Sequence, residues 1–143
     1  MRGLRFFGDL AVHRDWIETS GWAIEVLDGL CNRLLVCTYD NQSLDPLERL
    51  EGTIKPMREA MTVVQQGGIE SVVLVTDGAG YAGNRKIANA PKSATFLDGH
   101  GMGCLTSEVL ANIARNAGAK VTIIHGDASA NEQVQREILQ ALS

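Results

Sequence analysis

The stretch that decides the fold is Val72-Val73-Leu74-Val75-Thr76-Asp77-Gly78-Ala79-Gly80, an apolar run that stops at an aspartate and two alternating glycines. A second run, Ala94-Thr95-Phe96-Leu97-Asp98, is followed by Gly99-His100-Gly101-Met102-Gly103. Such runs predict buried strands whose chain then turns where glycine is least strained. In parallel α/β proteins, binding sites lie at these carboxyl ends. The candidate residues for binding a partner or a ligand are therefore Asp77, Gly78, Gly80, Asp98, Gly99, His100, Gly101 and Gly103.

Helices and strands alternate from Asp45 onward. Asp45 suits a helix cap and Pro46 a first helical position, so a helix is expected over 46–66. Its apolar stripe consists of Leu47, Leu50, Ile54, Met57, Met61 and Val64, and Pro56 predicts a kink or two abutting helices. Strands over 71–76 and 94–98 are followed by a helix with the stripe Met102, Leu105, Val109, Ile113 and Ala117. A strand over 120–124 and a last helix with Val134, Ile138, Leu139 and Leu142 complete the pattern. This order predicts a single α/β domain over 1–143, with a central sheet of four to five strands and helices packed on it.

Residues 1–33 leave two alternatives open. Segments 4–10 and 33–39 have the composition of strands. Between them, Trp16, Thr19, Ala23, Val26 and Leu30 follow a helical stripe. The second half also resembles one arm of a hairpin before Asp28-Gly29. We favour the hairpin there, because Gly21 would destabilise a helix.

The composition limits the class of protein. With 143 residues, 45% of them hydrophobic and 21% charged, the chain is long enough for one ordinary core. A net charge of -4 argues against nucleic acid and against anionic membranes as partners. No signal peptide and no membrane span is evident, so we expect a cytoplasmic protein.

The cysteines do not indicate a disulfide framework or a metal site. Cys31, Cys37 and Cys104 are odd in number and form no CxxC pair, so they are read as small apolar residues in a reducing compartment. A reactive Cys104 near a helix start remains the alternative. We expect no metal and no cofactor.

The polar motifs do not define an enzyme. Gly78-Ala79-Gly80-Tyr81-Ala82-Gly83 matches the GxGxxG pattern of dinucleotide sites, but the polar segment up to Pro91 is unlike the helix that this fold requires. His100 lies two residues after Asp98, where it suits a base or a ligand, yet no nucleophile of known spacing accompanies it. We therefore assign no catalytic residue and lean towards a protein that is not an enzyme.

Segment 94–105, with the following helix, Gly118 and the strand over 121–124, resembles the core of a STAS domain, the anti-sigma-factor antagonist family. The resemblance extends over 43–142. It implies a regulatory domain that binds a protein partner through residues 98–103 and the helix after them. Gly99 stands where the regulated members carry a phosphorylatable serine. No phosphorylation switch is therefore expected at this turn.

A second family offers a different function. The two glycine turns are similar to the oxyanion-hole turns of the crotonase and ClpP-like superfamily, in which backbone N–H groups stabilise an oxyanion. Gly80 and Gly103 would then supply the turns. This alternative implies a small enzyme that binds an acyl-CoA or a nucleotide, with a small-molecule ligand at the glycine turns. A homo-oligomer is open under both interpretations.

Overall fold

The computed structural model describes residues 2–24, 31–38, 45–76 and 107–143, with the side chains of 46–51 and 53 excepted. Nine helices and strands occur in these ranges. Their order is β1 (Arg2–Phe7), α1 (Leu10–Thr19), β2 (Trp22–Ile24), β3 (Arg33–Cys37), α2 (Pro46–Gln66), β4 (Ser71–Thr76), α5 (Ser107–Asn116), β5 (Lys120–His125) and α6 (Glu132–Leu142).

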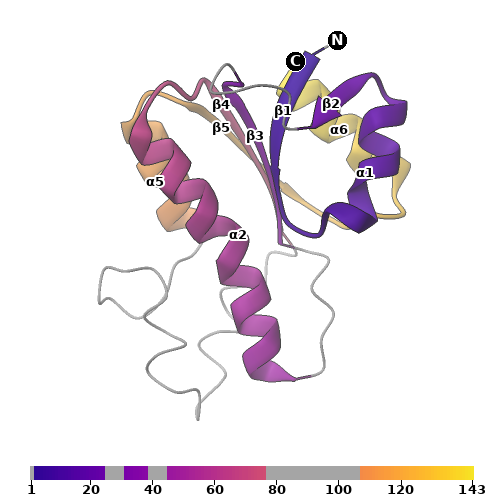
Figure 1. Ribbon diagram of the computed structural model, residues 1–143, viewed down its shortest axis with the longest axis horizontal. Coiled ribbons are helices and arrows are strands. Elements are labelled where there is room, and N and C mark those ends of the chain that lie inside the picture. Colours follow the sequence, from indigo (N-terminus) through magenta and orange to yellow (C-terminus); the bar gives the residue numbers. More distant parts are fainter. Residues whose placement is uncertain (1, 25–30, 39–44, 77–106) are drawn as a thin grey trace.

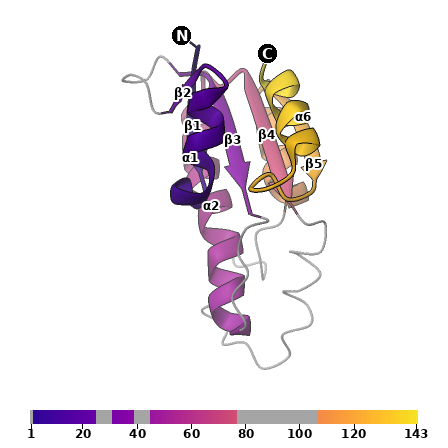
Figure 2. The ribbon, with the colours of Figure 1, turned by 90° about the vertical axis from the view of Figure 1, so that its right-hand side faces the viewer.

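The strands form one parallel sheet in the order β2-β1-β3-β4-β5. Helices α1 and α6 cover one face of this sheet, and α2 and α5 cover the other (Figure 1). Figure 2 shows the first of these faces, with β3 and β4 visible between α1 and α6. The expected α/β fold is thus confirmed. The neighbouring strands β1 and β3 are followed by helices on opposite faces of the sheet, so the direction in which the chain winds reverses between them.

The two faces follow from alternation along the strands. In β3, Leu34 and Val36 belong to the core under α2 and α5, whereas Leu35 and Cys37 belong to the core under α1 and α6. Successive side chains of a strand point to opposite faces, so a strand covered on both sides must be apolar throughout. This requirement explains the continuous apolar runs in β3 and β4.

Helix α2 runs unbroken from Pro46 to Gln66 with Pro56 inside it, so the alternative of two abutting helices is wrong. The described part of its predicted stripe, Ile54, Met57, Met61 and Val64, is buried as expected. In Figures 1 and 2, α2 continues past the ends of the strands, so its middle passes the carboxyl-terminal edge of the sheet. Within the described ranges, no helix has the length and apolarity needed to cross a membrane.

The hairpin expected in the second half of segment 16–30 is wrong. Helix α1 ends at Thr19, and Gly21 adopts a φ of 90° that stops it. The chain then enters β2, which pairs in parallel with β1, and β1 lies between β2 and β3. The pattern was misleading because a short strand and a hairpin arm have the same period of two.

The stripe expected on the helix before β5 needs a correction. Helix α5 is described over Ser107–Asn116, and its fully buried side chains are Leu110, Ala111 and Ala114, whereas Ala117 is exposed. The expected stripe residues Met102 and Leu105 lie outside the described residues. The predicted Val109 and Ile113 are only partly buried at the margin of the core. The small side chains of Ala111 and Ala114 allow the helix backbone to approach its neighbours. The buried face of α5 therefore follows residues 110, 111 and 114 and not the expected positions 109 and 113. The strand expected over 94–98 lies outside the described residues.

Candidate functional site

A pocket of about 330 Å³ lies where β1 and β3 end. Its walls come from the turn between β1 and α1, from the end of β3 and from the middle of α2. The lining residues are Gly8, Asp9, Cys37, Thr38, Gly52, Lys55, Pro56 and Glu59. We call it the switch-point pocket, because it lies at the point where the winding of the sheet reverses. Open α/β sheets bind their ligands in this position.

The β1–α1 turn depends on one glycine. Gly8 has a φ of +147°, and a Cβ atom built there would lie 2.7 Å from the carbonyl oxygen of Cys37 and 3.1 Å from the Phe6 ring. No larger residue fits while the end of β1 stays this close to the end of β3. Asp9 then caps α1, because its Oδ1 accepts a hydrogen bond from the backbone N–H of Ala11 at 3.2 Å. The cap fixes a carboxylate on this wall.

Thr38 supplies a fixed hydroxyl at the end of β3. The residue is buried, and both its backbone N–H and its hydroxyl donate to the carbonyl oxygen of Val75, at 2.9 Å and 3.3 Å. The hydroxyl proton is therefore used within the sheet. What the Thr38 hydroxyl oxygen retains is its capacity to accept a hydrogen bond.

The α2 wall presents one helical face, since Gly52, Lys55, Pro56 and Glu59 are spaced by three and four residues. Pro56 has no N–H, so the carbonyl oxygen of Gly52 cannot receive the hydrogen bond that an α-helix normally provides from this position. Lys55 and Glu59 are both exposed, one turn apart. Within the part of the chain that the structure describes, neither side chain has a hydrogen-bond or ion-pair partner.

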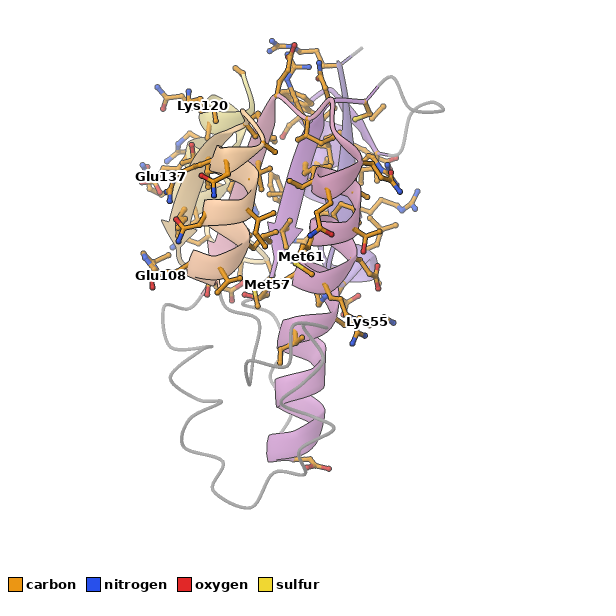
Figure 3. The ribbon with its side chains drawn as sticks, turned by 90° about the vertical axis from the view of Figure 1, so that its left-hand side faces the viewer. Lys55, Met57, Met61, Glu108, Lys120 and Glu137 are labelled. Atoms are coloured by element: carbon orange, nitrogen blue, oxygen red, sulfur yellow. The ribbon has the colours of Figure 1, made fainter. Side chains whose placement is uncertain are left out.

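The two sides of α2 serve different purposes (Figure 3). Met57 and Met61 lie between α2 and α5, and the Sδ of Met57 is 3.9 Å from the Ser107 hydroxyl oxygen. Lys55 projects from α2 on the side away from α5. The helix therefore anchors itself in the core with one face and presents charge to the switch-point pocket with another.

The described histidines do not line this pocket. His13 is buried in α1, where its Nδ1 accepts a hydrogen bond from the indole N–H of Trp16 at 3.0 Å and its ring packs on Phe6. His125 is exposed at the end of β5, two strands away from β3. Among the described residues, no group of three or more His, Cys, Asp or Glu side chains is arranged to hold a metal ion.

The site residues expected from the sequence, Asp77, Gly78, Gly80, Asp98, Gly99, His100, Gly101 and Gly103, all lie outside the described residues, as does Cys104. The proposed role of both glycine turns in binding therefore stays a prediction. Only the strand before the first turn is described: β4 ends at Thr76, at the same carboxyl-terminal edge as the pocket.

Sequence reasoning missed the residues of the switch-point pocket, although two signals were present. Phe7-Gly8-Asp9 is another strand end with glycine and aspartate, the same combination that marked the later turns. Gly52 stands four residues before Pro56, which identifies the backbone carbonyl that the proline leaves without its helical partner. Neither signal shows from sequence alone that β1 and β3 are neighbours.

No family model matches the chain, and no curated protein or solved structure shows significant similarity to it.

Proposed function

We propose that this domain binds a small polar molecule in the switch-point pocket. The observation that supports the proposal is the pair Lys55 and Glu59, two charged side chains on the wall of a pocket at the carboxyl ends of β1 and β3. Ligand pockets usually enclose about 300–1,000 Å³, so the volume suits a small molecule. A ligand would supply the opposite charges to these two side chains.

The first turn of α1 argues against a nucleotide phosphate as the ligand. Helix N-termini attract anions through free N–H groups, and dinucleotide folds use this turn for the pyrophosphate. Here Asp9 already accepts the N–H of Ala11 and adds a negative charge. A polyphosphate would be repelled by the carboxylates of Asp9 and Glu59. The proposal therefore favours a ligand without a concentrated negative charge.

A thermal-shift panel tests the proposal. The full chain is screened with amino acids, amines, carboxylates, nucleotides, CoA esters and divalent metals, because a ligand well above its dissociation constant raises stability by a few kcal/mol. Every hit is repeated with Lys55→Gln and Glu59→Gln, and with Lys120→Gln as the matched control. Lys120 is exposed at the start of β5, so it lies at the amino-terminal ends of the strands, away from the pocket. A shift that is lost in the two pocket variants and kept in the control supports the proposal, whereas equal shifts in all variants contradict it.

The resemblance to STAS domains supports a second proposal, a non-enzymatic regulatory role in the cytoplasm through protein binding around Asp98–Gly103 and the helix after them. Its support is the order of the elements, since α5, Gly118, β5 and α6 follow one another as the resemblance requires. The same panel separates the alternatives. Stabilisation by a CoA ester would contradict this second proposal and favour the crotonase-like enzyme.

A further inference from the structure

The hydrogen-bonding groups of the switch-point pocket define a ligand class, provided that the pocket binds a small molecule as proposed above. We infer that the ligand is a small zwitterion with a primary ammonium group and a carboxylate, the chemistry of an amino acid. The inference rests on the acceptors contributed by Asp9, Gly52 and Glu59 and on the ammonium of Lys55, which is the one cationic side chain among the described residues that line the pocket.

The acceptors of the pocket match an ammonium group. Two are the carboxylates of Asp9 and Glu59, which come from opposite walls, and the third is the Gly52 carbonyl that Pro56 leaves without its helical hydrogen bond. A primary ammonium has three N–H donors and no acceptor, so its hydrogen-bonding capacity matches a pocket wall that offers acceptors. Hydrogen bonds between such charged partners are among the stronger ones in proteins.

Lys55 provides the matching site for the anionic end. It precedes Glu59 by four residues, a spacing at which opposite charges can pair along a helix. The structure places no ion pair between them. Because both side chains are on one helical face, about one turn apart, a short ligand with two charged ends reaches both.

A ligand of single charge fits less well. An anion alone would satisfy Lys55 but would face the carboxylates of Asp9 and Glu59. A cation alone would satisfy the carboxylates and would leave Lys55 beside a like charge. A zwitterion avoids both repulsions, and such repulsion of the wrong ligand is a common source of specificity.

Isothermal titration calorimetry on the full chain tests this inference. The probes are a set of α-amino acids, 4-aminobutyrate, butyrate and butylamine. We expect at least one zwitterion to bind about tenfold or more tightly than both butyrate and butylamine, because each single-charge probe loses one charge-assisted contact. Lys55→Gln and Glu59→Gln should each weaken its binding about tenfold, whereas Lys120→Gln and Glu137→Gln, exposed residues on β5 and α6, should leave it within about twofold.

Other outcomes separate the inference from the proposed function. Butyrate or butylamine could bind as tightly as every zwitterion, with an affinity that depends on Lys55 or Glu59. That result would contradict the inference of a zwitterionic ligand but would support the pocket as a binding site. The same holds if only nucleotides, CoA esters or metals bind there. If no probe of either panel binds, both the inference and the proposed function fail. Circular dichroism of the variants is the folding control, and we expect native spectra because Lys55 and Glu59 are exposed.

Discussion

The two edges of the sheet use their charged residues differently. At the amino-terminal edge, the guanidinium groups of Arg2 and Arg33 lie 5.1 Å and 5.8 Å from the centre of the Trp22 ring. Arg33 Nε also donates to the carbonyl oxygen of Leu142 at 2.9 Å. At the carboxyl-terminal edge, Lys55 and Glu59 have no such partners among the residues that the structure describes.

This contrast shows where the fold needs charge and where it does not. The arginines hold the last turn of α6 against the starts of β1, β2 and β3. Their positive charge also suits the negative end of a helix dipole. The carboxyl-terminal edge is instead shaped by backbone constraints at Gly8 and Pro56 and by the Asp9 cap of α1. The side chains of Lys55 and Glu59 have no partner in the described part of the protein. Groups that the fold does not use are available for binding.

The largest expected effect concerns the core behind the pocket. Met57 is 2% exposed and follows Pro56 directly, so Met57→Ala should lower the free energy of unfolding by about 2–5 kcal/mol through the cavity it leaves. Val12→Ala, at a side chain that is 38% exposed, is the control and should change little. Urea denaturation measures both. A small effect at Met57 that depends on protein concentration would mean that the stripe of α2 faces another subunit.

The next effect concerns the turn that brings β1 and β3 together. Gly8→Ala should destabilise the protein by about 2–4 kcal/mol, because the new Cβ meets the Cys37 carbonyl oxygen at 2.7 Å and the backbone has a positive φ. Gly21→Ala is the matched control, since Gly21 has a φ of +90° but nothing within 4 Å of the added atom. It should cost only about 1–2 kcal/mol. Equal losses in the two variants, measured by urea denaturation, would show that Gly8 is not a point of close packing.

Arg33 tests the amino-terminal edge. Arg33→Gln should lower the free energy of unfolding by about 1–3 kcal/mol, because it removes the hydrogen bond to Leu142 and the contact with Trp22. Any ligand found for the pocket should bind with unchanged affinity. Arg14→Gln is the control: its ion pair with Glu18 is exposed and should be worth about 0.5 kcal/mol or less. Thermal unfolding measures the stability of both variants, and calorimetry measures their ligand binding. If Arg33→Gln lowered ligand affinity and left stability unchanged, the structural role of Arg33 would be contradicted.

The smallest expected effect on stability is at the pocket itself. Lys55→Gln and Glu59→Gln should each leave the free energy of unfolding within about 0.5 kcal/mol of the parent, since neither side chain has a partner in the described ranges. Urea denaturation in the absence of ligand measures this. A loss above about 1 kcal/mol would give these charges a structural role and would remove the contrast between the two edges.

Local signals in the sequence predicted most of the fold. The capping residue type at Asp45, Pro46 and the apolar stripe predicted the bounds of α2 correctly, and the apolar run before Asp77 predicted β4. The error at residues 22–24 arose because strand partners depend on contacts distant in the sequence. A strand of three residues carries no signal that it pairs in parallel with β1.

The candidate site was harder to predict from the sequence for the same reason. Gly8 directly follows β1 and Cys37 ends β3. These two strands are neighbours in the order β2-β1-β3, which local periodicity does not encode. Pro56 was recognised as an interruption of α2, but its effect on the Gly52 carbonyl becomes relevant only because both residues line the same pocket. Topology therefore decided which local features belong together.

The most direct measurement of the central claim is a ¹H–¹⁵N NMR titration of the full chain with the tightest ligand from the panel. If the carboxyl-terminal edge is the binding edge, the largest shift changes should fall on the backbone amides of Gly8, Thr38 and Gly52, which surround the pocket. The chemical shifts of the Trp22 and Arg33 amides should not change. Shift changes concentrated at Trp22 and Arg33, with Gly8 and Gly52 unmoved, would contradict the account.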